Sequence, residues 1–166
     1  MKIHLVANLS ASGQVILAET PLSREVSPHV AGRGFAMAAK CGCVVLGATT
    51  HRMFADAIRT TLPDIDVVVL THGDAGEGAF AARSVEDAIS YLEGKGRTDA
   101  CLLGGTAAYN AFLEAGAVDE LSVGIMPEVT AGGGMLQGKA GVPEAFSLAE
   151  DPTVIDGTVV CRFVRE

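Results

Sequence analysis

Short, unbroken apolar runs alternate with helical patterns along most of the chain. The runs cover residues 3–8, 43–46, 66–70, 100–103 and 121–126, and each is predicted to form a strand. The run Val67-Val68-Val69-Leu70 is apolar throughout, which is typical of a strand buried on both faces of a parallel sheet. Regular alternation of strands and helices predicts an α/β fold with three layers, in which helices cover both faces of a mostly parallel central sheet. Residues 67–70 are expected in the interior of that sheet.

Four helical patterns separate these strands. Ser27 followed by Pro28 is a typical helix start, and Ser84 is expected to cap a helix in which Asp87 completes a capping box. Three of the helices are predicted at residues 28–40, 85–94 and 106–115. The remaining helix, second in chain order, is predicted to start at a cap at Thr49 or Thr50 and to end before Pro63. In the second helix, the residues expected to face inward are Met53, Phe54, Ala57 and Ile58.

The pattern changes after Met126. A proline- and glycine-rich loop follows, and residues 146–150 and 154–164 are then predicted as strands with no helix between them. Strands joined without a crossover helix pair antiparallel. We therefore expect a mixed sheet whose C-terminal strands are antiparallel, within a single domain spanning residues 1–166.

The acidic balance of the chain limits the classes of partner. Twelve Lys and Arg residues against twenty Asp and Glu residues give a formal net charge of −8, and no basic patch interrupts it. Such a chain repels nucleic acid and anionic membranes, and no apolar run reaches the roughly 20 residues of a membrane span. We predict a cytoplasmic protein that acts on a small molecule. The four cysteines and four histidines lack the spacing of zinc ligands, so no metal site is predicted.

Two strand-to-helix junctions repeat one design, an apolar strand followed by glycine and a helix start. They are Gly47-Ala48-Thr49-Thr50 and Gly104-Gly105-Thr106-Ala107. A helix start offers free backbone N–H groups and a partial positive charge, and glycine lets a phosphate come close to the backbone. Together the junctions could hold a diphosphate, although either junction alone is better explained by a tight strand-to-helix turn. Neighbouring junctions at the carboxyl edge of an α/β sheet favour the ligand site.

The run from Leu103 to Leu121, LGGTAAYNAFLEAGAVDEL, resembles the dihydrofolate-reductase-like superfamily. It is most similar to the branch that contains the reductase domain of bacterial riboflavin biosynthesis. Other segments follow in the order of that family: the opening strand with Ser10 to Gln14 after it, the Leu46–Thr50 junction, and residues 131–136 before the final strands. The resemblance covers nearly the whole chain and implies a dihydrofolate-reductase-like fold, an NADPH cofactor and a homodimer.

The resemblance also implies positions for the ligands. The diphosphate of NADPH is expected between the two junctions. The cofactor residues it implies are Ala7, Asn8, Gly47, Ala48, Thr49, Thr50, Thr71, His72, Gly104, Gly105, Thr106 and Ala107, with Ala7 and Asn8 near the nicotinamide and Thr71 and His72 near the adenosine. The substrate residues are Ser10, Ser12, Ser23 and Ser27, which could also form an ordinary polar turn. His29 is the nearest titratable candidate for a proton donor, and a water molecule is the alternative.

Departures from the family pattern bear on the substrate. Ser12-Gly13-Gln14 replaces a common Asp-Gly-Lys, Leu103 replaces a frequent Glu, and Ala48 replaces an Arg that pairs with the cofactor's extra phosphate, a role Arg52 could take. Residues 28–40 contain no Asp or Glu, whereas dihydrofolate reductases carry a carboxylic acid there. The implied function is an NADPH-dependent reductase that transfers hydride to a pyrimidine, ribosylaminopyrimidine or pterin-like substrate, resembling 5-amino-6-(5-phosphoribosylamino)uracil reductase. The alternatives are a dihydrofolate reductase and a nucleotide-binding module without turnover.

Overall fold

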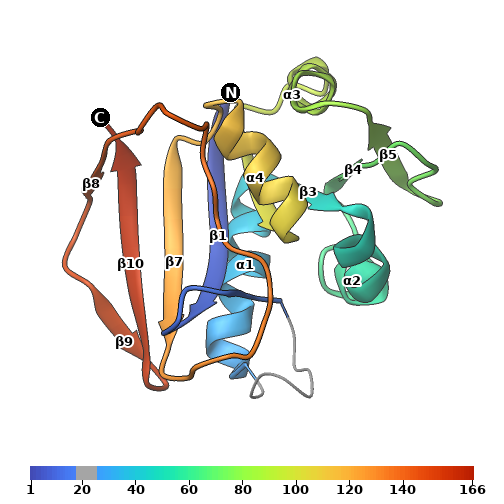
Figure 1. Ribbon diagram of the computed structural model, residues 1–166. Helices are drawn as coiled ribbons and strands as arrows, with labels where there is room; N and C mark the ends of the chain where they lie inside the picture. Colours follow the sequence, from blue (N-terminus) through green and yellow to red (C-terminus); the bar gives the residue numbers. More distant parts are fainter. Residues whose placement is uncertain (18–25) are drawn as a thin grey trace.

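The computed structural model describes residues 1–17 and 26–166 and contains one large mixed sheet flanked by helices (Figure 1). In chain order the elements are β1 (Lys2–Ser10), β2 (Val15–Ile16), α1 (Pro28–Cys41), β3 (Cys43–Gly47), α2 (Ala48–Thr61), β4 (Asp66–Leu70), β5 (Ala79–Ala82), α3 (Val85–Gly94), β6 (Asp99–Gly104), α4 (Thr106–Glu114), β7 (Glu120–Met126), β8 (Phe146–Leu148), β9 (Thr153–Ile155) and β10 (Thr158–Arg165).

The sheet runs in the order β5-β4-β3-β6-β1-β7-β10-β8, with β2 paired to β1 and β9 paired to β10. The six strands from β5 to β7 are parallel to one another. The remaining pairs, β10 with β7, β8 and β9, and β2 with β1, are antiparallel. The predicted α/β class, the mixed sheet and the interior position of residues 67–70 are confirmed.

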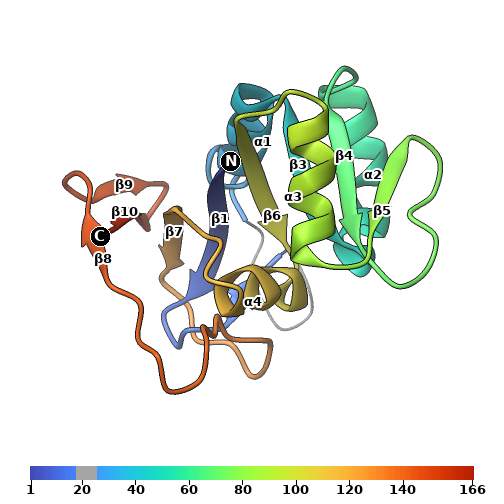
Figure 2. The same cartoon turned by 90° about the horizontal axis from the view of Figure 1, so that it is seen from above.

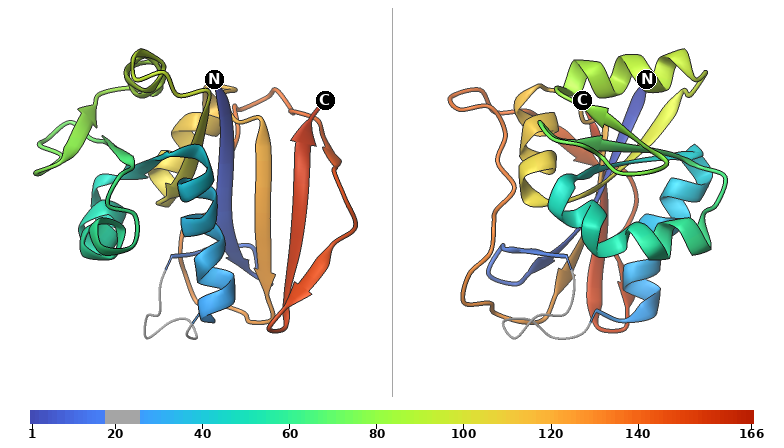
Figure 3. Two further views of the ribbon diagram at one scale, coloured as in Figure 1. Left: turned by 180° about the vertical axis from the view of Figure 1, so that it is seen from behind. Right: turned by 90° about the vertical axis from the view of Figure 1, so that its right-hand side faces the viewer.

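Helices cover both faces of the parallel part of the sheet. Figures 1 and 3 show α4 on one face and α1 on the other, where α1 packs against β1, β3 and β6. Right-handed crossovers place α2 on the α1 side and α3 on the α4 side. Figure 2, seen from above, also shows the connection between β7 and β8 on the α4 side. The central strands β1, β3 and β6 are the most deeply buried, with no exposed surface at Leu5, Val44, Val45 and Leu102.

The ends of two helices form as their residues predict. Ser27 caps α1 by accepting a hydrogen bond from the Val30 amide at 3.3 Å. Ser84 caps α3 in the same way, accepting from the Asp87 amide at 3.1 Å. The Asp87 carboxylate accepts from the Arg83 amide at 2.8 Å, one residue before the Ser84 amide that the predicted capping box would use. Local pairs of this kind depend only on residues three or four positions apart.

Helix α2 differs from its prediction. It begins at Ala48 with Gly47 as its N-cap, so neither Thr49 nor Thr50 caps it. Ile58 is buried as expected, but Met53 is half exposed and Ala57 is exposed. The helix packs against β3 and β4, and among its residues only Thr50 and Ile58 are buried.

The strand predictions need three corrections. Two short strands, β2 and β5, are not predicted because runs of two and four residues carry little periodic signal. The single strand predicted for residues 154–164 is wrong. It is a hairpin of β9 and β10, turning at Asp156 and Gly157, whose φ angles are 48° and 80°.

None of the helices in residues 1–17 and 26–166 is long and apolar enough to cross a membrane. Cys41, Cys43 and Cys101 are free and buried, and burial raises the pKa of the Cys41 thiol to about 11 and that of Cys43 to about 12. These thiols stay protonated at neutral pH and act as small apolar side chains.

Candidate functional site at the carboxyl edge of the parallel strands

The two glycine junctions lie side by side at the carboxyl edge of the sheet. They follow β3 and β6, which are adjacent parallel strands paired at Leu46 and Gly104. A β-carbon added to Gly105 would lie 2.7 Å from Thr50 Oγ1. A β-carbon added to Gly47 would lie 3.5 Å from the Gly105 nitrogen. The predicted adjacency of the two turns is confirmed, and their glycines leave room that any side chain would fill.

Both helix starts leave their backbone N–H groups free of side-chain caps. The N-caps Gly47 and Gly105 make no side-chain hydrogen bond, and neither first turn carries an acidic residue. Thr49 and Ala107 in these turns are exposed. Two partial positive charges therefore point at the same edge of the sheet, an arrangement that attracts an anion.

The two glycines of the second junction differ in conformation. Gly104 has a φ of +122°, which L side chains rarely adopt, and a β-carbon there would lie 3.1 Å from the Tyr109 hydroxyl. Gly105 has a φ of −81°, open to any residue. The peptide bond between them is cis. Space, rather than backbone conformation, therefore accounts for glycine at position 105.

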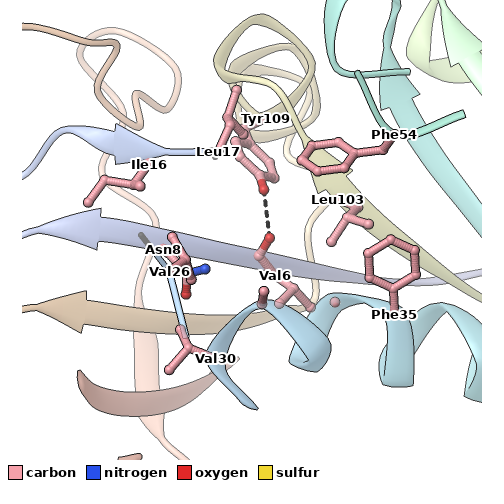
Figure 4. Close-up of a pocket in the computed structure, with 12 residues that line it drawn as sticks. Val6, Asn8, Ile16, Leu17, Val26, Val30, Phe35, Phe54, Leu103 and Tyr109 are labelled. Carbon is pink, nitrogen blue, oxygen red and sulfur yellow. Dashed lines mark hydrogen bonds between the residues drawn. The ribbon is translucent and has the colours of Figure 1, made fainter. Parts of the chain in front are cut away.

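A cavity of about 70 Å³ lies beside the second junction (Figure 4). It is enclosed by β1, β2, α1, α2, β6 and α4 and is mostly apolar. Its lining residues are Val6, Asn8, Ile16, Leu17, Val26, Val30, Ala31, Gly34, Phe35, Phe54, Leu103 and Tyr109. The Tyr109 hydroxyl donates a hydrogen bond to the Val6 carbonyl at 2.6 Å and so ties α4 to β1. Burial raises the pKa of Tyr109 far above its usual value, so the phenol keeps its proton.

A polar group lies behind the cavity wall. Arg33 of α1 donates hydrogen bonds to Asn8 Oδ1 at 2.8 Å and to Ser122 Oγ at 2.7 Å. Burial lowers the pKa of the Arg33 guanidinium. Sequence reasoning missed Arg33, although one signal was available: it precedes Gly34 within the buried stripe of α1, where a charged side chain is unusual.

Two of the predicted substrate serines form a cluster at the turn between β1 and β2. Ser10 Oγ donates to Gln14 Oε1 at 2.9 Å, Ser12 also donates to Gln14, and Thr130 Oγ1 lies 3.2 Å from Ser10 Oγ. Neither serine lines the cavity. Ser27 caps α1, and Ser23 lies outside the described residues. Substrate contact by these four residues stays a prediction.

His29 lies on the surface at the start of α1. Its side chain is 79% exposed, and Nδ1 lies 2.9 Å from the Asp156 carboxylate. Hydrogen bonds from His29 and Ser27 lower the pKa of Asp156. The imidazole does not line the cavity, so the structure brings it together with the β9–β10 turn rather than with the junctions. Its role as proton donor stays a prediction.

The predicted adenosine residues follow β4, the next strand along the same edge. Thr71 is half-buried and His72 exposed. Arg83 Nη1 donates to the carbonyl oxygens of Thr71 and Gly73 at 3.2 and 3.1 Å. Arg52 is exposed on α2 and donates to Thr49 Oγ1 at 3.3 Å. Two exposed cations therefore stand at this rim of an otherwise acidic protein.

Comparison with known proteins gives matches in structure but not in sequence. No protein-family model matches the chain, and no curated protein matches it. A protein from Shewanella sp. PV-4 assigned to riboflavin biosynthesis matches with a TM-score of 0.76 and 19% identity, over 100% of this chain and 99% of that one. Dihydrofolate reductase from Enterococcus faecalis, solved with NADP(H), matches with a TM-score of 0.74 and 18% identity, over 99% of this chain and 96% of that one.

A third match is longer than this chain. It is the diaminohydroxyphosphoribosylaminopyrimidine deaminase/5-amino-6-(5-phosphoribosylamino)uracil reductase of Thermotoga maritima, with a TM-score of 0.74 and 14% identity. The match covers 99% of this chain and 56% of that protein. The fold of this chain is thus a known architecture. The chain has the dihydrofolate-reductase-like fold, which it shares with proteins of riboflavin biosynthesis.

Proposed function

We propose that this protein is an NADPH-dependent reductase that transfers hydride to a pyrimidine, ribosylaminopyrimidine or pterin-like heterocycle. The observation that carries the proposal is the contact between two uncapped, glycine-containing helix starts next to an apolar cavity. Structural neighbours support it: one was solved with NADP(H), and another is named as a uracil reductase.

The residues at the carboxyl edge fit a dinucleotide. The N–H groups of the Gly47–Thr50 and Gly104–Ala107 turns would bind the diphosphate, since no side chain of the described residues caps either turn. The backbone of Ala7 and Asn8, at the end of β1, would bind the nicotinamide. Thr71 and His72 would border the adenosine, with Arg83 or Arg52 near its phosphate. These cations and helix starts offset the net charge of −8 locally.

The protein's own contribution to the reaction is position. Bound NADPH supplies the hydride, and the chain orients donor and acceptor and excludes water. Tyr109 holds the start of α4 against β1 through its bond to the Val6 carbonyl, so the nicotinamide side and the diphosphate side of the site form one rigid unit. Phe35, Phe54 and Leu103 provide a dry wall for a flat ring.

The source of the proton distinguishes this site from that of a dihydrofolate reductase. Helix α1 has no acidic residue, and it lines the cavity with Val30, Ala31, Gly34 and Phe35. Among the described residues, no carboxyl or imidazole group lines the cavity. Protonation of a pterin ring by a nearby acid is therefore disfavoured, and water is the expected proton source.

The test is to titrate the protein with NADPH by fluorescence and then to follow NADPH consumption with two substrates. We expect micromolar binding, turnover with 5-amino-6-ribosylaminouracil phosphate, and at least about a hundredfold lower kcat/KM with dihydrofolate, a difference of about 2.7 kcal/mol in transition-state binding. Binding without turnover of either substrate would instead indicate a nucleotide-binding module. Absence of NADPH binding would contradict the proposal.

A further inference from the structure

Arg33 is a half-buried cation without a carboxylate partner in the described part of the chain. Four other arginines each form an ion pair with a carboxylate. The pairs are Arg59 with Asp56, Arg97 with Asp66, Arg162 with Glu120, and Arg165 with Glu144. Arg33 instead donates to two neutral oxygens, those of Asn8 and Ser122. Holding a guanidinium away from water without a counter-charge costs stability, so its position calls for a functional explanation.

Strand β7 is shaped to accept this guanidinium. A β-carbon added to Gly124 would lie 2.6 Å from Arg33 Nη1 and 2.6 Å from Asn8 Oδ1. Glycine at position 124 therefore leaves the space in which Arg33 and Asn8 meet. Ser122, two residues earlier and on the same face of β7, accepts the second hydrogen bond. Three elements, β1, β7 and α1, converge on one pair of side chains.

The pairing with Arg33 determines which end of the Asn8 carboxamide faces the cavity. A guanidinium has only hydrogen-bond donors, so Asn8 must direct its oxygen toward Arg33 and its NH₂ group the other way. Asn8 lines the cavity, and Figure 4 shows its nitrogen directed among the lining residues. In residues 1–17 and 26–166, Arg33 is the one hydrogen-bond partner of this side chain. The Asn8 NH₂ group is thus a hydrogen-bond donor at the cavity, and the positive charge of Arg33 lies next to the other end of the same amide.

We propose that the Asn8 carboxamide, oriented by Arg33, binds a carbonyl oxygen of the heterocycle, such as that of a dioxopyrimidine, and disfavours a ring that places an amino group at that position. This inference rests on the proposed function and names the residues that select the ring. Asn8 would donate its N–H to the ring carbonyl, and Arg33 is a positioning residue that acts through Asn8. An amino-substituted ring would place N–H against N–H, and its protonated form would also meet the charge of Arg33.

The test compares two rings of similar size, uracil and 2,4-diaminopyrimidine, by calorimetry on the full chain with and without NADPH. Wild type is expected to bind uracil at least tenfold more tightly, equivalent to about 1.4 kcal/mol. Asn8→Asp should reverse this preference, because a carboxylate pairs with Arg33 and offers only acceptors to the ring. Arg33→Met should abolish the preference, and Arg33→Lys should restore part of it.

Lys40→Met is the matched control, because it removes one positive charge from an exposed position on the same helix. It should leave both affinities within about twofold of wild type. A folded Asn8→Asp protein that keeps the wild-type preference would overturn the proposal. The proposal is also overturned if wild type binds both rings equally or neither ring.

Failure of this inference can be told apart from failure of the proposed function. A fluorescence titration with NADPH reports on the glycine junctions and does not depend on the Arg33 side chain. If NADPH does not bind but uracil is preferred, the proposed function fails and the ring selectivity stands. If NADPH binds and the ring preference is missing, the selectivity fails alone.

Discussion

The parallel and antiparallel parts of the sheet differ sharply in how they are covered. In β3, the side chains of Val44, Val45 and Leu46 are completely buried between two helical layers. In the C-terminal strands, Val154 is 70% exposed and Val159 is 38% exposed. Most of the parallel strands are joined by crossover helices, which cover both faces of the sheet, whereas hairpin strands need only a turn. Strands β4 and β5, joined by a loop, are the exception. Connection type, and not hydrophobicity alone, therefore governs which strands are buried.

The same division separates two roles in the site. The carboxyl edge of the parallel strands holds the two glycine junctions and the end of β1. The last parallel strand, β7, contacts Arg33 rather than the junctions. Its Ser122 accepts a hydrogen bond from Arg33, and its Gly124 leaves room for the guanidinium. The chain after β7 supplies Thr130, which bonds to the turn between β1 and β2. In the proposed site, the carboxyl ends of the parallel strands form the ligand edge, and β7 and the segment after it contact this edge through Ser122, Gly124 and Thr130.

The largest contrast between the two parts is expected in stability. Leu102→Ala in β6 removes a side chain with no exposed surface and should cost about 2–5 kcal/mol of the free energy of unfolding. Val159→Ala in β10 removes a side chain that is partly exposed within one chain and should cost less than about 1 kcal/mol in the monomer. Chemical denaturation of both variants, at concentrations low enough to dissociate a dimer, measures the difference. Equal losses in the monomer would contradict this contrast in burial.

Gly105→Asp is expected to abolish NADPH binding. The added carboxylate would fill the space between the junctions and oppose the diphosphate, with about 4 kcal/mol of repulsion for two unit charges 4 Å apart at an effective dielectric constant of 20. The φ of −81° tolerates aspartate, but its β-carbon requires Thr50 Oγ1 to move from 2.7 Å. A modest loss of stability is therefore expected too, measured as the melting temperature beside the NADPH Kd.

Two controls separate charge from packing at this junction. Gly105→Ala carries the same β-carbon without the charge and should weaken NADPH binding less than Gly105→Asp does. Gly94→Asp adds the charge at the end of α3, where a β-carbon meets nothing within 4 Å, and should leave binding unchanged. Normal NADPH affinity in a folded Gly105→Asp protein would remove the diphosphate role from this turn.

A homodimer is the next expectation, and the open face of the C-terminal strands is its expected interface. Ile125, Val159 and Val154 lie opposite one another in adjacent strands β7, β10 and β9, and all three are exposed. Light scattering should give twice the 17.0 kDa of one chain. Val159→Asp should raise the Kd of the dimer at least about tenfold, or about 1.4 kcal/mol. Val129 is exposed in the loop after β7, and Val129→Asp should leave the Kd of the dimer unchanged. A wild-type protein that is monomeric in light scattering would contradict the expectation.

The smallest effect is expected at the rim cations. Arg83→Met should weaken NADPH binding about threefold to fivefold and leave NADH binding unchanged, because an exposed ion pair contributes up to about 1 kcal/mol. Arg52→Met tests the other candidate on α2 in the same titration. If both variants bind NADPH like wild type even at low salt, neither arginine contacts the extra phosphate.

Features that depend on neighbouring residues could be predicted from the sequence. The caps at Ser27 and Ser84 involve residues three positions apart, and the apolar runs of β3 and β4 indicate burial by themselves. The two glycine junctions were recognisable because strand, glycine and helix start follow one another directly. Their contact followed from a general property of parallel sheets, whose carboxyl ends meet at one edge.

Features that depend on which strands become neighbours were decided only by the tertiary structure. Arg33 meets Asn8 and Ser122 across 25 and 89 residues of sequence, and no local pattern encodes such distances. Met53 is half exposed although its spacing matches the inward side, because the packing of α2 on β3 and β4 decides which of its residues the sheet covers. The local sequence was enough to predict most of the elements and the place of the junctions, but not β2, β5 or the β9–β10 hairpin. Packing between distant elements determined the donor that faces the cavity, because the direction of the Asn8 amide depends on the cation behind it.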